Sequence, residues 1–167
     1  SKQASGGGVY AKRPNYGLSS QCEFAIDFTP MAACITSSEP RFVVWGDSYA
    51  MHLVPALVAS NPGIKLAQAT RSVCGPLLDV GPFVNAASYY NRSWAEECIK
   101  FNRSVVSYVR REKSVEVVVL SSPFVQYLGE ENYSLLTPGG VQPPSLQFAI
   151  DRMKATILKD LAKDQIR

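Results

Sequence analysis

Residues 41–52 constrain the fold of this chain more than any other stretch. An apolar run at 42–45, rich in β-branched and aromatic residues, leads directly into Gly46. Such a run predicts a buried strand that ends in a tight turn. Apolar residues at helical spacing follow, so the turn opens a helix. We expect the rest of the domain to be built around this strand, turn and helix.

Asp47 and Ser48 lie at the expected start of that helix. Backbone N–H groups and the positive end of the helix dipole converge there, close to the Ser48 hydroxyl. A serine nucleophile and half of an oxyanion hole fit at this position, with Asp47 in a supporting role. A simpler interpretation is also open, because Asp and Ser are favoured N-cap residues and Gly-Asp-Ser after a strand can be a helix cap and nothing more.

The composition suits one compact domain, since the 167 residues are 46% hydrophobic and 19% charged. The net charge is only +3 and the basic residues are mostly scattered, so nothing indicates nucleic-acid binding. No run approaches the roughly 18 apolar residues of a membrane helix, and residues 1–20 lack the apolar centre of a signal peptide. We therefore expect any targeting or anchoring element to lie outside this sequence.

Four cysteines make an even count without a Cys-x-x-Cys motif, which argues against a zinc site. In an oxidising compartment, pairing of near neighbours gives the disulfides Cys22–Cys34 and Cys74–Cys98. The alternative is four buried thiols in a cytosolic protein.

Two further strands are expected, at 64–69 and at 115–120, and the second is the most strongly β-branched run of the chain. Apolar residues at helical spacing between 94 and 109 predict an amphipathic helix that connects them. Strand, helix and strand in this order imply parallel pairing with a right-handed crossover.

The other segments are predicted to be less regular. Residues 1–36 have linker composition at first and then two cysteines, which suggests a linker and a disulfide-stapled extension before a domain at 37–167. Residues 78–90 are expected to be irregular, and residues 129–144 to form a long polar loop. A last amphipathic helix is expected from Leu146 to about Asp164.

The loop at 70–77 follows the second strand, so in a parallel sheet it lies beside the turn that carries Ser48. The Gly75 amide is a candidate oxyanion donor, because glycine lets a backbone N–H approach a reacting atom closely. Alternatively, Cys74-Gly75-Pro76 is simply a turn held by a disulfide.

The segment Val43-Val44-Trp45-Gly46-Asp47-Ser48-Tyr49-Ala50-Met51-His52-Leu53 resembles the first block of the SGNH (GDSL-type) hydrolases and transferases. More narrowly, it is similar to the SGNH domain fused to membrane acyltransferase-3 proteins that O-acetylate bacterial surface polysaccharides. That block usually reads Gly-Asp-Ser-His-Ala, so Tyr49 departs from it. Cys74-Gly75-Pro76-Leu77 is similar to the Cys-Pro-Pro-Leu segment of these domains, which corresponds loosely to the second block. The usual Gly-x-Asn-Asp is replaced by Ser121-Ser122-Pro123-Phe124.

The resemblance implies an α/β fold with a three-layer, doubly wound parallel sheet of the SGNH/flavodoxin-like type. It also implies a catalytic base from a C-terminal Asp-x-x-His, yet no histidine follows Ser122. We therefore expect the fold to be incomplete at the C-terminus, with the base beyond Arg167. His52, four residues after Ser48 on the predicted helix, is the weak alternative base.

By resemblance, the expected function is acyl transfer through Ser48, namely O-acetylation of a bacterial cell-surface polysaccharide such as O-antigen. The partners would be a carbohydrate acceptor and an upstream membrane acyltransferase domain that supplies acetyl groups from acetyl-CoA, so this domain would bind no cofactor or metal directly. The location would be periplasmic, tethered to the inner membrane. The alternatives are a secreted carbohydrate esterase and a non-catalytic glycan- or partner-binding module on a degenerate SGNH fold.

Overall fold

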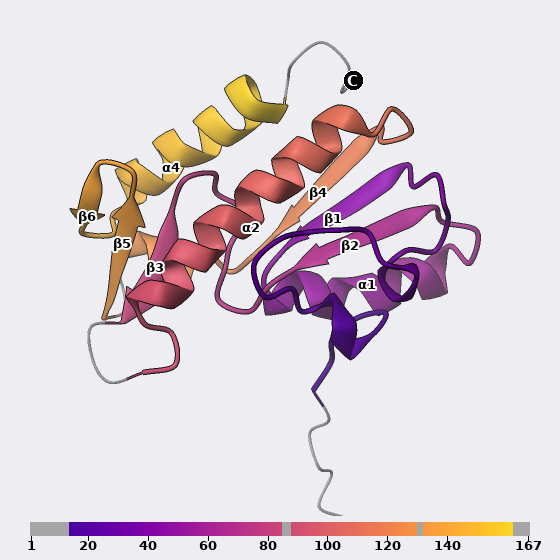
Figure 1. Ribbon diagram of the computed structural model, residues 1–167, viewed down its shortest axis with the longest axis horizontal. Coiled ribbons are helices and arrows are strands. Elements are labelled where there is room, and N and C mark those ends of the chain that lie inside the picture. Colours follow the sequence, from indigo (N-terminus) through magenta and orange to yellow (C-terminus); the bar gives the residue numbers. More distant parts are fainter. Residues whose placement is uncertain (1–13, 85–87, 130–131, 162–167) are drawn as a thin grey trace, which may run out of the picture.

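A computed structural model describes residues 14–84, 88–129 and 132–161 (Figure 1). Its centre is a parallel sheet in the order β2 (Leu66–Thr70), β1 (Phe42–Gly46), β4 (Val117–Ser121). The three strands and their parallel pairing confirm the α/β prediction, with each expected strand displaced by only one or two residues. The register sets Gly46 opposite both Thr70 and Ser121, so all three strands end at one edge.

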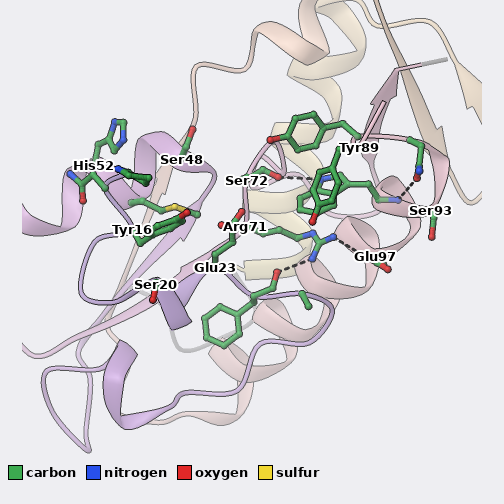
Figure 2. A pocket seen from close by; sticks show the side chains of 18 residues that line it. Tyr16, Ser20, Glu23, Ser48, His52, Arg71, Ser72, Tyr89, Ser93 and Glu97 are labelled. Carbon is green, nitrogen blue, oxygen red and sulfur yellow. Dashed lines mark hydrogen bonds and ion pairs between the residues drawn. The ribbon is translucent and has the colours of Figure 1, made fainter. Parts of the chain in front are cut away.

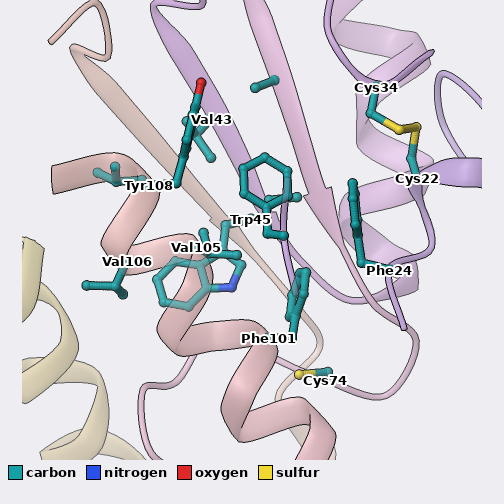
Figure 3. Packing of buried hydrophobic residues seen from close by; sticks show 14 of the residues in the cluster. Cys22, Phe24, Cys34, Val43, Trp45, Cys74, Phe101, Val105, Val106 and Tyr108 are labelled. Carbon is teal, nitrogen blue, oxygen red and sulfur yellow. A yellow bond between two sulfur atoms is a disulfide. The ribbon is translucent and has the colours of Figure 1, made fainter. Parts of the chain in front are cut away.

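Helices cover both faces of this sheet, α1 (Ser48–Ser60) on one side and α2 (Arg92–Arg111) on the other (Figure 1). The side chains of β1 alternate between the two faces, because successive residues of a strand point in opposite directions. Val43 and Trp45 pack in the core cluster with residues of α2, as Figure 3 shows, whereas Val44 packs with residues of α1. A parallel sheet buried on both faces explains why this strand reads as continuously apolar.

A second, antiparallel sheet lies beside the first, in the order β3 (Gly81–Val84), β5 (Tyr133–Thr137), β6 (Gly140–Gln142). The prediction of irregular structure at 78–90 and of a polar loop at 129–144 was therefore wrong in part. Pro138 and Gly139 make the two-residue turn of a hairpin, and Gly140, the first residue of β6, has a φ of 112°. Gly81 is required within a strand, since an added Cβ would lie 2.2 Å from the Ala95 carbonyl oxygen.

Three helical segments complete the described C-terminal part. The helix α3 (Val125–Leu128) follows β4, and α4 (Leu146–Ala155) continues into the π-helix η3 (Thr156–Leu161). The last helix was predicted from Leu146, and its expected end near Asp164 lies outside the described residues. Within the described part of the chain, no helix is long and apolar enough to cross a membrane.

The N-terminal segment covers the free edge of β2. It contains the 3-10 turns η1 (Ser20–Cys22) and η2 (Ala32–Cys34), which the expected disulfide Cys22–Cys34 joins. Glu23 forms a parallel bridge with Thr70, and Ile35 an antiparallel bridge with Ala67. Because an uncovered edge strand invites pairing with other chains, this cover protects the sheet. Most of the expected linker, residues 1–13, lies outside the described residues.

Candidate functional site

Ser48 is the first residue of the helix α1 and lies directly after the turn that follows the strand β1. The chain passes so close to β4 at this point that a Cβ on Gly46 would lie 1.8 Å from the Ser121 carbonyl oxygen. Glycine is therefore the residue that lets the turn form here. Asp47 caps the helix by accepting a hydrogen bond from the Tyr49 amide at 3.0 Å.

Asp47 is buried, with 2% of its surface exposed, and it is held from a distant part of the chain. Its carboxylate also accepts hydrogen bonds from the Ser122 hydroxyl at 2.5 Å and from the Gln126 amide at 3.3 Å. Burial raises the pKa of the Asp47 carboxyl above its ordinary value, and these hydrogen bonds oppose the shift. These hydrogen bonds fix the turn that carries Ser48, and the supporting role of Asp47 in the chemistry stays a prediction.

Two cavities of unequal size meet at Ser48. The larger has a volume of about 860 Å³ and is lined by Ser48, His52, Arg71 and Ser72, among others. The smaller, of about 140 Å³, is lined by Ser48, Asp47 and the residues Val73, Pro123, Val125, Gln126 and Tyr133. Figure 2 shows Ser48 and His52 toward one end of the larger cavity and Tyr89 and Glu97 toward the other. A half-buried serine with space on two sides can contact two different molecules or groups.

Val73 departs from ordinary backbone geometry beside the smaller cavity. Its φ is 56°, which is in the left-handed region that β-branched residues rarely adopt. Phe124, on the opposite loop between two lining residues, also has a positive φ, of 58°. Such strained positions cluster at functional sites, because the surrounding structure must hold them in place.

The Gly75 amide, for which we predict the role of an oxyanion donor, already has a hydrogen-bond partner in the structure. It donates a hydrogen bond to the hydroxyl of Tyr127 at 2.9 Å, and Tyr127 is fully buried, which raises the pKa of its phenol. A Cβ on Gly75 would lie 2.7 Å from the Tyr127 ring, so close ring packing accounts for glycine here. For the Gly75 amide to stabilise an oxyanion at Ser48, that oxyanion would have to displace the Tyr127 hydroxyl.

His52 is exposed on α1 and lines the same cavity as Ser48. Its ring lies 6.5 Å, centroid to centroid, from the ring of Tyr49. Among the described residues no hydrogen bond joins His52 to Ser48, so the structure brings the weak alternative base to the cavity without engaging the nucleophile. Nor does the described part of the chain hold a group of three or more His, Cys, Asp or Glu side chains placed to bind a metal ion.

Arg71 is one of the polar residues of the site that the sequence analysis missed, together with Gln126, Tyr127 and Asn102. It follows β2 directly, its side chain is fully buried, and its amide donates to the Gly46 carbonyl at 3.1 Å. The guanidinium donates to Glu97 at 2.7 Å and to the Phe24 carbonyl at 2.8 Å. Burial lowers the pKa of Arg71, and the hydrogen bond and charge of Glu97 oppose that shift. Its position after a strand of a parallel sheet was the available signal.

The loop after Arg71 is fixed to α2 at several points, one of which is the hydrogen bond that the Trp94 indole N–H donates to the Ser72 carbonyl at 3.2 Å. The expected disulfide Cys74–Cys98 is formed, with the two Cα atoms 5.6 Å apart. The buried side chain of Asn102 donates to the carbonyls of Gly75 at 3.0 Å and Leu77 at 3.1 Å. The helix α2 therefore fixes the position of the loop that borders Ser48.

The fold and the site place the chain in a class of α/β proteins that carry a serine at a strand-to-helix turn of a parallel sheet. More particularly, the chain belongs to the SGNH family: the family described as "SGNH domain (fused to AT3 domains)" matches residues 19–165. The family resemblance found in the sequence is thereby confirmed. This family indicates hydrolase or acyltransferase activity and an AT3 membrane domain in the same protein. No curated protein and no solved structure matches the chain.

Proposed function

We propose that this domain transfers an acetyl group through Ser48 to a hydroxyl of a bacterial cell-surface polysaccharide. The observation that carries the proposal is the position of Ser48, at the N-terminus of α1 and on the walls of two cavities. A transferase must handle a donor and an acceptor at one nucleophile, and two cavities at one serine suit that task. The fusion of this family to AT3 domains also supports acyl transfer as the activity.

In the first step the Ser48 oxygen attacks the carbonyl carbon of the acetyl donor, and a base takes the hydroxyl proton. Negative charge develops on the carbonyl oxygen. Asp47 occupies the Tyr49 amide, so we assign the Ser48 amide and the dipole of α1 to this oxyanion. The bond to the leaving group then breaks, and that group leaves with the proton. Acetyl-Ser48 remains.

In the second step a sugar hydroxyl attacks acetyl-Ser48, its proton passes to the same base, and the Ser48 oxygen leaves and recovers a proton. Water in place of the sugar would give an esterase. The base has two possible sources: His52, the one histidine of the sequence, or the Asp-x-x-His expected beyond Arg167. A lost base typically lowers the rate by roughly 10⁴-fold.

The donor side requires no cofactor bound by this domain. We propose that the AT3 domain supplies acetyl groups that originate from acetyl-CoA, and that this domain works on the periplasmic side of the inner membrane. The smaller cavity at Ser48 has about 140 Å³. Because a water molecule in the liquid takes about 30 Å³, this cavity can hold a group of a few heavy atoms, such as an acetyl group.

Labelling with a fluorophosphonate probe tests the nucleophile in the full-length protein. Wild type is expected to be labelled at one serine, and Ser48→Ala to lose the label. Ser60→Ala is the matched control, since Ser60 is an exposed serine at the end of the same helix. Labelling that persists in Ser48→Ala, or that never occurs, would contradict the proposal. His52→Ala decides the base: loss of acetyl transfer assigns that role to His52, and retention assigns it to another residue.

One observation favours a second function. The Gly75 amide is bound by Tyr127, so one of the two expected oxyanion donors is occupied. A non-catalytic glycan-binding module would need neither that donor nor a base. It would bind its glycan equally well after Ser48→Ala and would show no turnover in wild type.

A further inference from the structure

The larger cavity beside Ser48 has an aromatic wall that the acyl chemistry does not use. Tyr89, Tyr90 and Trp94 contact one another with ring centroids 5.0 to 5.5 Å apart. Tyr89 is 75% exposed, although the other two rings hold it in place, whereas Trp94 is only 8% exposed. Figure 2 shows Tyr89 over the side of the cavity that Arg71 and Glu97 line. An exposed ring supported in this way offers a flat apolar surface at little cost in conformational entropy.

Polar groups surround this ring within the same cavity. The carboxylates of Glu23 and Glu97 can accept hydrogen bonds, and Asn91 and Ser93 can both donate and accept them. A pyranose ring presents the matching features, an apolar C–H face and an edge of hydroxyl groups. Its C–H bonds are attracted to the electron-rich face of an aromatic ring. The cavity volume of about 860 Å³ also lies within the usual range for small-molecule sites, roughly 300–1,000 Å³.

The charged side chains that line the cavity favour the binding of neutral sugars over that of anionic sugars. Its described lining holds two carboxylates, Glu23 and Glu97, and one guanidinium, Arg71. That guanidinium is already engaged by Glu97 and by the Phe24 carbonyl, and it lies 3.7 Å from the centroid of the Trp94 ring. A carboxylate on a sugar at Tyr89 would therefore meet Glu23, and His52, the other side chain of the described lining that can carry a positive charge, lies toward the opposite end of the cavity (Figure 2). Like charges brought together in this way discriminate against a ligand.

We propose that the larger cavity is the acceptor subsite and that it takes a neutral pyranose unit, stacked on Tyr89, in preference to a uronic acid or a phosphorylated sugar. The word acceptor rests on the acyl transfer proposed above. The binding site itself rests on the aromatic wall, the hydrogen-bonding groups and the excess of carboxylates.

The test uses full-length Ser48→Ala protein, which binds without turnover, and a panel of methyl glycosides of neutral hexoses and 6-deoxyhexoses with the corresponding uronates. Saturation-transfer NMR gives the Kd of each. We expect neutral glycosides to bind and uronates to bind about fivefold more weakly, the size of a weak charge contact in water. An added Tyr89→Ala should weaken neutral binding about tenfold, as loss of a stacking ring commonly does.

Three controls sharpen the result. Tyr89→Phe keeps the ring and should retain binding, which separates stacking from a hydrogen bond of the hydroxyl. Leu146→Ala removes an apolar side chain that is 60% exposed on α4 and should leave binding as it was. Glu23→Gln should reduce the difference in Kd between neutral glycosides and uronates, because it removes a negative charge from the cavity. The proposal is overturned if no neutral glycoside binds, if uronates bind as tightly, or if Tyr89→Ala has no effect.

The labelling experiment keeps this proposal distinct from the proposed function. If wild type resists the fluorophosphonate but neutral sugars bind in a Tyr89-dependent way, acyl transfer fails and the sugar site stands. If Ser48 is labelled and sugar binding is indifferent to Tyr89, the sugar site fails and acyl transfer stands.

Discussion

Replacing Asn102 with alanine probes how the loop beside Ser48 is held. Asn102 is completely buried on α2. Its side-chain oxygen accepts from the indole N–H of Trp45 at 2.8 Å, and its nitrogen donates to the carbonyls of Gly75 and Leu77. One amide thereby joins the central strand β1, the loop after β2 and the helix α2. Alanine cannot make any of these hydrogen bonds.

The cost follows from which groups lose a partner. The Gly75 carbonyl still accepts from the Leu77 amide at 2.8 Å and from the Tyr127 hydroxyl at 3.4 Å, so it is not left without a partner. The Trp45 indole N–H and the Leu77 carbonyl lose the bond from Asn102, and each buried polar group left unpaired costs about 1–3 kcal/mol. The lost side chain adds a small cavity. We expect the free energy of unfolding to fall by about 3–5 kcal/mol, a large part of the 5–15 kcal/mol typical of a domain.

Urea unfolding followed by tryptophan fluorescence measures this change. Asn91→Ala is the matched control, because Asn91 is an exposed N-cap with a single hydrogen bond to the Trp94 amide, worth about 1 kcal/mol. The midpoint should fall much further for Asn102→Ala than for Asn91→Ala, with the slope m unchanged. Equal losses in the two variants would refute the view that the Asn102 amide holds the loop.

Three further predictions concern the turn and the loop. Burial raises the pKa of Asp47, so the folded chain binds that proton more tightly than the unfolded chain, and the ionised carboxyl costs stability above the ordinary carboxyl pKa of about 4. The free energy of unfolding of Asp47→Asn, relative to that of wild type, should therefore rise between pH 3 and 7. A difference that does not change with pH in urea unfolding would contradict this. Replacing Cys74 and Cys98 by alanine opens a loop of sequence separation 24 and should cost about 3 kcal/mol, measured as a lowered Tm. Reducing agent should then lower the Tm of this variant less than that of wild type, because only the disulfide Cys22–Cys34 is left to reduce. Gly46→Ala places a Cβ 1.8 Å from the Ser121 carbonyl oxygen, so we expect a loss of about 2 kcal/mol or more in unfolding and of fluorophosphonate labelling, whereas wild-type labelling would show that the turn tolerates the methyl group.

The central sheet was predictable because its signals are local. The strands β1 and β2 are short runs that are almost entirely buried, so burial shows in the run itself, whereas β4 is only partly buried and was found from its β-branched residues. The hairpin β5–β6 was missed because the Pro and Gly residues at 138–140 are equally typical of a loop and of a hairpin turn. What makes residues 133–137 a strand is pairing with β3, about 50 residues earlier in the chain, and no local pattern records that.

The candidate site divides in the same way. The position of Asp47 and Ser48 at the turn was predicted correctly because the strand, the turn and the helix cap are contiguous in the sequence, while their roles in the chemistry stay predictions. Tyr127 was not connected with Gly75, since the two residues are 52 positions apart and meet only through the packing of α3 against the loop. The attachment of the loop to α2 was predicted from the spacing of the cysteines, because a pair of cysteines can be recognised in the sequence as a disulfide, whereas a tyrosine that will be buried cannot be recognised in this way.

The remaining partners could have been found from the predicted sheet alone. Gly46 pairs with Thr70 on one side and with Ser121 on the other, so the residues that follow each strand must gather at one edge. Those residues are Asp47, Arg71 and Ser122, and the structure shows Ser122 bonded to Asp47 and the Arg71 amide bonded to Gly46. Once parallel pairing is inferred, the first two residues after every strand therefore form one group of candidates, however far apart they lie in the sequence.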